Sequence, residues 1–271
     1  MIKDRLALQL YSVRDYAAAD LFGVLEQVRA MGYSGVEFAG LYGYDPLAVK
    51  EKCAQLGLTP ISAHVPLEEL TEDLEGTLDC YEKLGCRNVV VPYLSEEYRP
   101  GTPGFEGVIE SVRTVGAAAN RRGMVLQYHN HDFEFVKIDG EYGLDRLYRL
   151  VGPELLQTQL DACWVNVGGE DPVDYLKKYA GRIPTVHLKD FVGNRSAAVY
   201  QLIGIESEKK TTTQFEYRPL GKGLQNIPAI VEAAVAGGAE WFIVEQDEPS
   251  MGLTSMECAA ASVEYLLNNV M

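Results

Sequence analysis

Polar side chains crowd the end of one apolar segment, VLQYHNHDFEF at residues 125–135. Side chains alternate between the two faces of a β-strand, so Gln127, His129 and His131 share one face if this segment is a strand. Imidazole nitrogens bind divalent transition metals, and they also move protons near neutral pH. The segment therefore indicates a strand whose end takes part in metal binding or acid–base chemistry.

Other candidate ligands are far away along the chain, each near the end of a short β-rich run. Asp161 ends LQTQLD, IPTVHLKD contains His187 and Lys189, and Glu245 lies in EWFIVEQ. Similar polar residues occur in three earlier runs: Gln9, Glu37 and His64. Each residue alone is explained as well by a helix cap or a hydrogen-bonded loop side chain. Together, imidazoles and carboxylates converging from different strands predict a divalent-metal site.

The elements that must position these residues follow one alternating pattern. The eight β-rich runs are residues 6–11, 35–39, 59–65, 88–93, 124–130, 156–161, 183–190 and 240–246. Between them, apolar residues recur every three to four positions, as in helices. Several of these segments begin with Asp or Asp-Pro and end in glycine, which are common helix start and stop signals.

Eight strand–helix units within about 250 residues predict a (β/α)8 TIM barrel, with residues 1–271 forming a single domain. An open, doubly wound sheet is the alternative, but LQLYSVRD lacks the glycine-rich loop expected after its first strand. In a barrel, catalytic residues lie at the C-terminal ends of the strands, where the candidate ligands occur. Residues 191–223 form a long insertion after the seventh strand, which predicts a lid or a mobile surface segment.

Composition excludes some classes of partner. Twenty-four Lys and Arg against 39 Asp and Glu give a net charge of −15, which argues against nucleic acid and anionic membranes as partners. No apolar run approaches the ~18 residues of a transmembrane helix, and the N-terminus lacks a signal-peptide pattern. The five cysteines are scattered without a C-x-x-C motif, so we expect reduced thiols and a cytoplasmic location.

The chain resembles the sugar phosphate isomerase/epimerase superfamily of xylose isomerase-like TIM barrels. This group includes ketohexose 3-epimerases, hydroxypyruvate isomerase, inosose dehydratase and endonuclease IV. The resemblance covers essentially the whole chain and depends on these motifs, all in family order: YHNHDFEF, LDACWVNVGGEDP, GRIPTVHLKD, RPLGKG and WFIVEQD. It implies one divalent ion, with Mn, Co, Mg, Fe and Zn all open, held by strands five to eight in the order Glu, Asp, His, Glu.

Three of those four ligands have direct counterparts in this sequence. The family Asp, His and final Glu match Asp161, His187 and Glu245. The first Glu does not, because the aligned residue is the neutral amide Gln127. His129, two residues further on the same face, is then the substitute ligand, and His131 is either an alternative ligand or a substrate contact.

The resemblance also implies the chemistry. The metal polarises a substrate carbonyl, and Glu245 or a histidine removes the α-proton to give an enediolate. Since an amide cannot act as a base, epimerisation by two metal-bound glutamates is in doubt, although His131 or Glu134 can replace the missing one. The leading interpretation is a metal-dependent sugar isomerase or epimerase, and the alternative is a dehydratase or lyase acting on a keto-sugar, an inosose or a 3-keto-glycoside.

Residue roles follow from these interpretations. The candidate catalytic residues are Glu245, His131, Lys189 and Glu134. The candidate substrate-binding residues are Gln9, Glu37, His64, Gln127, Trp164 and Arg218. Lys189 either stabilises the oxyanion or forms a salt bridge to Asp190 or Glu245. Trp164 is either a wall under a sugar ring or part of the core, and Arg218 either reaches the substrate or anchors the insertion.

Two other functions are compatible with a barrel of this kind. The net charge and the presence of only four histidines argue against a trinuclear zinc endonuclease. A metal-free barrel that binds a sugar without turnover is a further alternative. The resemblance also allows a homo-oligomer paired through the loops around the site.

Overall fold

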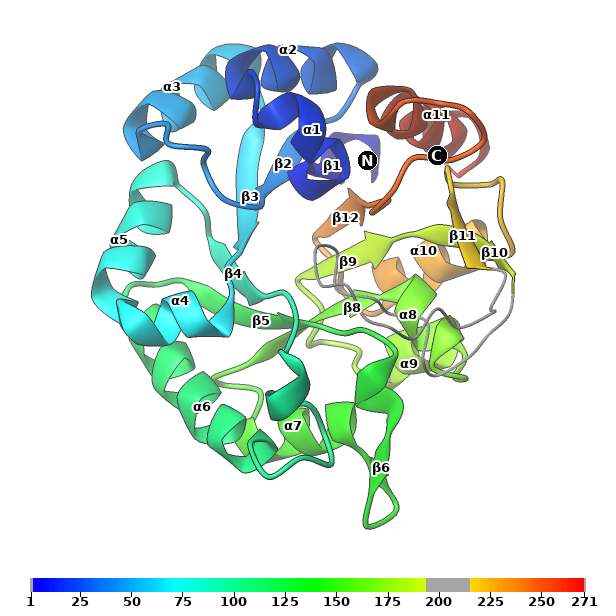
Figure 1. Cartoon of the computed structure of the whole chain (residues 1–271). Helices are drawn as coiled ribbons and strands as arrows, with labels where there is room; N and C mark the ends of the chain where they lie inside the picture. Colours follow the sequence, from blue (N-terminus) through cyan, green and yellow to red (C-terminus); the bar gives the residue numbers. More distant parts are fainter. Residues whose placement is uncertain (1, 194–214, 271) are drawn as a thin grey trace.

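Eight strands close into a parallel barrel at the centre of the computed structural model, which describes residues 2–193 and 215–270 (Figure 1). The strands are β1 (Leu6–Gln9), β2 (Gly35–Phe38), β3 (Thr59–His64), β4 (Asn88–Val91), β5 (Val125–His129), β8 (Gln157–Asp161), β9 (Thr185–Leu188) and β12 (Trp241–Val244). Around the barrel their order is β1-β12-β9-β8-β5-β4-β3-β2. Each strand falls within one of the eight predicted runs, so the predicted (β/α)8 TIM barrel is confirmed.

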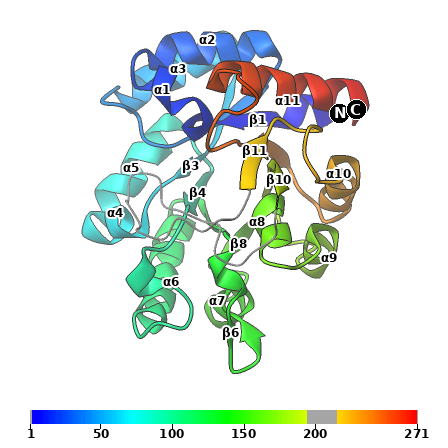
Figure 2. The same cartoon turned by 45° about the vertical axis from the view of Figure 1, so that its right-hand side comes forward.

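Helices surround the barrel on the outside (Figures 1 and 2). They are α1 (Arg14–Ala17), α2 (Leu21–Met31), α3 (Pro46–Leu56), α4 (Leu67–Glu72), α5 (Leu74–Leu84), α6 (Phe105–Arg121), α7 (Gly143–Val151), α8 (Ala162–Val167), α9 (Pro172–Lys178), α10 (Ile227–Ala236) and α11 (Ser255–Asn269). Within the described ranges, none of them is both long and apolar enough to cross a membrane.

The predicted helix starts are confirmed at three aspartates. Asp20, Asp45 and Asp171 immediately precede α2, α3 and α9, and each carboxylate accepts hydrogen bonds from backbone N–H groups of the first turn. Proline occupies the first position of α3 and α9, where its missing N–H has no intrahelical partner to lose. These local signals fix where each helix leaves the barrel rim.

Several short elements lie outside the barrel strands and the helices. They are the 3-10 turns η1 (Ile2–Arg5), η2 (Leu10–Val13), η3 (Glu96–Tyr98) and η4 (Phe133–Phe135), and the strand pairs β6 (Lys137–Ile138) with β7 (Glu141–Tyr142) and β10 (Asp190–Gly193) with β11 (Phe215–Arg218). The β6–β7 hairpin projects beyond the helices in both views (Figures 1 and 2). The predicted insertion at 191–223 thus includes most of β10 and all of β11, whereas residues 194–214, on which a lid or mobile segment was predicted, lie outside the described residues.

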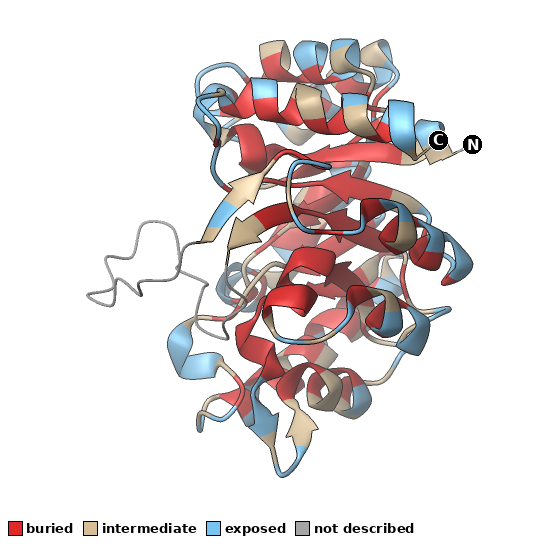
Figure 3. Ribbon diagram, turned by 90° about the vertical axis from the view of Figure 1, so that its right-hand side faces the viewer, coloured by how far each residue is buried: buried red, intermediate tan, exposed pale blue. Residues whose placement is uncertain are grey.

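The apolar core lies between the barrel wall and the helices, whose inner faces are buried (Figure 3). A small separate cluster of Ala7, Ile61, Ile243 and Trp241 is also apolar, whereas buried polar side chains fill the barrel interior towards the C-terminal ends of the strands. Completely buried polar side chains join strands across it, as where Gln9 donates to Glu37 at 2.8 Å and the Thr185 hydroxyl donates to Gln127 at 2.7 Å. A hydrogen-bonded polar layer therefore forms the floor beneath the C-terminal ends of the strands.

Asp190 organises the chain where the insertion leaves and rejoins the barrel. Its carboxylate accepts hydrogen bonds from the backbone N–H groups of Phe191, Gly221, Gly223 and Gln225, at 2.9 to 3.0 Å. A Cβ on Gly223 would lie 2.1 Å from Asp190 Oδ1, so only glycine allows this close approach. The RPLGKG motif therefore wraps around one buried carboxylate.

Replacing Asp190 with alanine should destabilise the fold, because buried N–H donors would lose their acceptor. We expect the free energy of unfolding to fall by about 2–4 kcal/mol, which urea denaturation would measure. Asp174 on α9 is exposed, and Asp174→Ala is the matched control, with an expected change within about 0.5 kcal/mol. Equal stabilities for the two variants would contradict this role for Asp190.

Candidate metal centre

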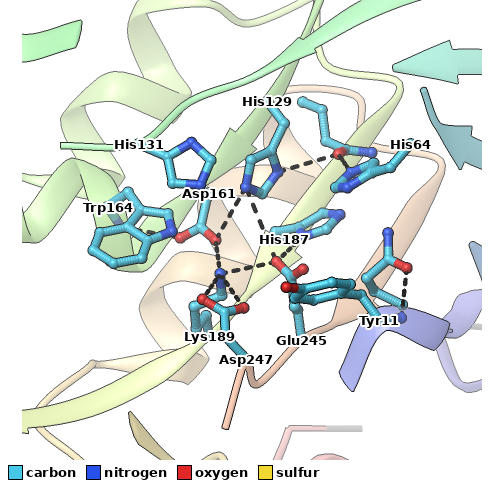
Figure 4. Close-up of polar contacts among 12 residues, drawn as sticks. Tyr11, His64, His129, His131, Asp161, Trp164, His187, Lys189, Glu245 and Asp247 are labelled. Atoms are coloured by element: carbon cyan, nitrogen blue, oxygen red, sulfur yellow. Dashed lines mark hydrogen bonds and ion pairs between the residues drawn. The ribbon is translucent and has the colours of Figure 1, made fainter. Parts of the chain in front are cut away.

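Four side chains from different strands converge at the C-terminal end of the barrel (Figure 4). They are His129 at the end of β5, Asp161 at the end of β8, His187 in β9 and Glu245 just after β12. All four are buried, and one ligand atom from each lies within 4.8 Å of the others. The structure therefore brings together the four residues that were predicted as metal ligands.

Asp161 provides the clearest test of whether this group fits a cation. Its Oδ1 accepts a hydrogen bond from the backbone N–H of Trp164 at 3.0 Å and so caps α8. Its Oδ2 is buried, forms an ion pair with the ammonium of Lys189 at 3.1 Å, and lies 3.7 Å from Nε2 of His129. Asp161 is thus both a helix cap and a carboxylate whose other oxygen is aimed at the centre. Two imidazoles and two carboxylates so arranged fit a divalent ion such as zinc, manganese, iron or cobalt.

Lys189 lies among the carboxylates of this centre (Figure 4). Its ammonium is 2.9 Å from Glu245, 3.1 Å from Asp161 and 3.1 Å from Asp247. Burial favours the neutral amine, but the three carboxylates outweigh it and raise the pKa of Lys189 well above its ordinary value. Of the two predicted salt-bridge partners, Glu245 forms the pair and Asp190 does not appear among the partners of this ammonium.

His187 lies between two carboxylates. Its Nε2 is 2.6 Å from Glu37, and its Nδ1 is 2.8 Å from Glu245. Burial lowers the pKa of His187, but the two carboxylates outweigh it and raise the pKa to about 10. Burial likewise opposes ionisation of Glu37, yet His64 and His187 hold its pKa well below the ordinary value. The imidazole is therefore protonated on both nitrogens, and binding a cation at Nδ1 would release one proton.

Gln159 lies directly beneath the centre and was missed by sequence reasoning. Its Oε1 is 2.7 Å from Nε2 of His64 and 3.2 Å from Nδ1 of His129, and its Nε2 donates to Glu37 at 2.7 Å. The signal was present, since Gln159 precedes Asp161 by two positions and therefore shares its face of the strand. A buried glutamine between predicted ligands is easily taken for an ordinary strand residue.

A cavity of about 420 Å³ opens beside the centre. Its lining includes five predicted site residues: His64, His129, His131, Lys189 and Glu245. It also includes residues that were not assigned a role from the sequence: Tyr11, Glu69, Tyr81, Tyr93 and Asp247. Each of Tyr11, Tyr93 and Asp247 follows a strand end by two or three residues, the position that a barrel reserves for substrate contacts.

Five of the six predicted substrate-binding residues do not line this cavity, and the fifth, Trp164, is described below. Gln9, Glu37 and Gln127 are completely buried in the polar layer beneath it. Arg218 pairs with Glu216 on the same strand at 3.0 Å, which favours the interpretation that it anchors the insertion. Gln9 and Glu37 were assigned from their place in predicted strands and Gln127 from strand alternation, but depth along the barrel axis is not visible in the sequence.

Trp164 belongs to a small aromatic cluster behind the cavity. It is completely buried, with its ring stacked 5.9 Å from Phe215 and tilted at 5.4 Å from His131. His131 is in turn stacked on Phe133 at 5.3 Å. Trp164 is therefore a core residue that supports His131 and does not contact the cavity as a sugar platform.

Glu134 is completely enclosed in the loop after β5. One carboxyl oxygen is 2.5 Å from the Tyr128 hydroxyl, and the other accepts a hydrogen bond from the backbone N–H of His131 at 2.8 Å. Burial outweighs these hydrogen bonds and raises the pKa of Glu134 to about 8. Glu134 does not line the cavity, and its contact with the site is the hydrogen bond to the backbone of His131.

The geometry predicts which residue of β5 contributes to metal binding. His129 belongs to the four-residue group, whereas the side chain of Gln127 is engaged by Thr185 in the layer beneath. His129→Ala should therefore lower bound zinc, measured by elemental analysis after dialysis, by about 10-fold or more, while Gln127→Ala should change it far less. The reverse order would refute His129 as the β5 ligand.

Glu134 should make stability depend on pH. A carboxyl group whose pKa is raised from 4.5 to about 8 stabilises the fold in its neutral form below pH 4.5, and this contribution is lost as the pH rises towards 8. Glu134→Gln keeps a neutral side chain, so the stability of the variant relative to the parent chain should rise between pH 5 and pH 8. Urea unfolding at several pH values would detect this, and a constant difference would show that Glu134 is ionised throughout.

Comparison with known proteins agrees with this geometry. Residues 25–268 match the family model of the xylose isomerase-like TIM barrels. An inosose dehydratase from Geobacillus thermodenitrificans (strain NG80-2) is 25% identical over 270 residues, covering 89% of this chain and 87% of that protein. One from Geobacillus kaustophilus (strain HTA426) is 27% identical over 189 residues, and that match spans 62% of this chain and only 61% of the relative.

Solved structures share the whole fold. A sugar phosphate isomerase/epimerase from Parabacteroides distasonis ATCC 8503 has a TM-score of 0.79 at 21% identity, covering 98% of this chain and 100% of that chain. The IolI protein with a bound zinc atom has a TM-score of 0.74 at 16% identity, covering 98% of each chain. The resemblance that the sequence motifs suggested is thus confirmed, and this chain belongs to the family of xylose isomerase-like TIM barrels.

Proposed function

We propose that this protein is a divalent-metal-dependent enzyme that removes a proton next to the carbonyl of a polyhydroxylated ketone and then eliminates water. The observation that carries the proposal is the convergence of His129, Asp161, His187 and Glu245 beside one open cavity. The inosose dehydratase relatives support dehydration as the reaction, and the zinc in the similar IolI structure supports a metal. A cyclic or open keto-polyol is the substrate class that this combination favours.

Each part of the reaction has a group in the cavity wall. When bound, a divalent ion supplies electrostatic stabilisation of the negative charge that develops on the carbonyl oxygen. The ammonium of Lys189 adds a second, fixed positive charge on the same side. Burial raises the pKa of Glu245, but Lys189 and His187 outweigh it and hold the pKa well below its ordinary value. Glu245 is therefore ionised, and because it lines the cavity it is the carboxylate placed to accept the α-proton.

The elimination step balances with Glu245 as the only proton carrier. The α C–H bond breaks, its proton goes to Glu245, and its electron pair is delocalised onto the carbonyl as an enolate. The enolate pair then forms the new C=C bond as the β C–O bond breaks, and the departing hydroxyl takes the proton back from Glu245 and leaves as water. One carboxylate is enough for this sequence when the proton and the hydroxyl lie on the same face of the substrate.

Epimerisation makes a different demand, because it needs one acid–base group on each face of the carbon. On β5 that second carboxylate is absent, since Gln127 is an amide bonded to Thr185 beneath the cavity. This favours elimination over two-carboxylate epimerisation and reverses the order of the two interpretations drawn from the sequence.

Isomerisation or epimerisation is kept as a second candidate because of His131. Its imidazole lines the cavity, and burial together with the charge of Lys189 holds its pKa well below the ordinary value. A neutral imidazole can accept or relay a proton near neutral pH. His131 could thus act on the face of the substrate opposite Glu245.

Solvent exchange separates these functions. The metal-loaded protein should place deuterium at the α-carbon of a keto-inositol or ketohexose in deuterated water, as seen by mass spectrometry. A product lighter by one water indicates the dehydratase, and an isomer of unchanged formula that carries deuterium indicates the isomerase. Absence of any exchange across both substrate classes would refute proton abstraction as the function.

Glu245→Gln tests the base directly, because an amide cannot accept the proton. We expect the rate at which the polyhydroxylated ketone is dehydrated to fall by about 10²–10⁴-fold. Glu248→Gln is the matched control, since Glu248 lies three residues further along the same loop, is exposed and does not line the cavity. A Glu245→Gln variant with full zinc content and unimpaired turnover would exclude Glu245 as the base.

A further inference from the structure

We infer that Glu37 is a positioning residue for the metal centre, because it fixes which ring nitrogen of His187 and His129 carries hydrogen. Glu37 lies in β2, does not line the cavity, and has no place among the four predicted ligands. The inference depends on the metal centre of the proposed function. Its first measurement, however, is made on the metal-free protein and so does not require that function to be correct.

Every polar neighbour of Glu37 is a group that can donate a hydrogen bond. One carboxylate oxygen lies 2.8 Å from Nε2 of Gln9, 2.6 Å from Nε2 of His187 and 3.1 Å from Nε2 of His64. The other lies 2.5 Å from the Ser62 hydroxyl and 2.7 Å from Nε2 of Gln159. An ionised carboxylate only accepts hydrogen bonds, so each of these neighbours must present a hydrogen towards Glu37.

The consequence for His187 is direct. Its Nε2 carries hydrogen because it faces Glu37. The nitrogen left to bind a cation is therefore Nδ1, which faces Glu245 at 2.8 Å. A carboxylate behind a ligand imidazole commonly fixes the ring orientation and the protonated nitrogen in this way.

The consequence for His129 passes through Gln159. Since the NH2 group of Gln159 must face Glu37, its carbonyl Oε1 faces Nδ1 of His129 at 3.2 Å. Nδ1 of His129 therefore carries the hydrogen, because two acceptors would otherwise face each other. Its Nε2 then presents a lone pair towards Asp161 at 3.7 Å and Glu245 at 4.0 Å.

A hydroxyl on the far side of Gln159 supports the same amide orientation. The NH2 group of Gln159 also donates to Oγ1 of Thr185 at 2.9 Å, and that hydroxyl passes its own hydrogen to Oε1 of Gln127 at 2.7 Å. All these groups are completely buried, so no solvent is available to satisfy a flipped amide. Glu37, which contacts His187 directly and reaches His129 through Gln159, thus determines which nitrogen of each imidazole is free to bind the metal.

Glu37→Gln changes this pattern with almost no change in shape. The new NH2 group cannot face His187 and Gln9 without opposing two donors, so it must face Ser62 and Gln159. Gln159 would then flip and present its NH2 group to Nδ1 of His129 and to Nε2 of His64, the two ring nitrogens that its oxygen faces in the parent chain. The hydrogen of His129 moves to Nε2, where it blocks the nitrogen that points to the centre.

Long-range ¹H–¹⁵N NMR spectra of the metal-free protein test the inference first. The chain has only four histidines, and a His129→Asn spectrum assigns the signal of His129. We expect hydrogen on Nδ1 and not on Nε2 of His129, and hydrogen on Nε2 of His187. Hydrogen on Nε2 of His129 in the parent chain would overturn the inference without any variant.

The Glu37→Gln protein gives the second measurement. Its spectrum should show the hydrogen of His129 on Nε2, and calorimetry should show zinc affinity weakened by about 10- to 100-fold. Ser62→Ala is the matched control, because it removes one hydrogen bond from Glu37 and contacts neither imidazole. It should keep the hydrogen on Nδ1 of His129 and a zinc affinity close to that of the parent chain.

The outcomes separate the inference from the proposed function. A folded Glu37→Gln protein with an unchanged His129 spectrum, or an equal loss of affinity in Ser62→Ala, would overturn the positioning role. If the parent chain binds no zinc, the metal-dependent function fails, while the metal-free spectra still decide the positions of the hydrogens. If Glu37→Gln does not fold, the spectrum of the parent chain decides alone.

Discussion

Buried negative charge is the constraint on which this site depends. Glu37, Asp161, Glu245 and Asp247 are all buried at one end of the barrel, and an unpaired carboxylate in such surroundings costs several kcal/mol. Each one is matched by a cation or by hydrogen-bond donors: Lys189 serves three of them, and His187 bridges the other to Glu245. The matching holds the side chains in place, so the ligand atoms are gathered before any substrate arrives.

This constraint also explains why the polar layer extends below the cavity. Buried carboxylates near the rim need hydrogen-bond donors from inside the barrel. Those donors carry further polar atoms, which are buried as well and must also be hydrogen-bonded. Gln159 and Thr185 continue the chain of hydrogen bonds to Gln127, across three strands. The site is therefore two layers deep, with ligands and proton-transfer groups above and residues that fix their orientation below. Aromatic packing of Trp164 against His131 supports the upper layer from the side.

Much of this architecture could be predicted from the sequence, for local reasons. The eight strands were recognisable because most are short apolar runs that follow a glycine, and several of the helical segments between them start with Asp or Asp-Pro. His129, Asp161, His187 and Glu245 were recognisable because barrel topology alone brings strand ends together. Neither step needed the packing of particular side chains, which is why both the barrel and the gathering of the four side chains agree with the structure.

The roles of some residues could not be predicted, because they depend on strand register and on loop conformation. Glu37 was expected in the cavity wall, but the pairing of β2 with β3 shifts between Val36 and Glu37, and such a shift leaves no mark in the sequence. Gln159 became significant only through its partners on other strands. The same holds for Glu134, whose loop folds back on Tyr128 and encloses the carboxyl group.

The central claim is that four side chains far apart in the chain hold one cation. X-ray absorption spectroscopy of the zinc-loaded protein tests it most directly, because it reports the ligand atoms around the metal. The account predicts one zinc per chain, with two imidazole nitrogens and carboxylate oxygens at about 2.0–2.2 Å. A spectrum without imidazole scattering, or a chain that retains no zinc, would contradict it.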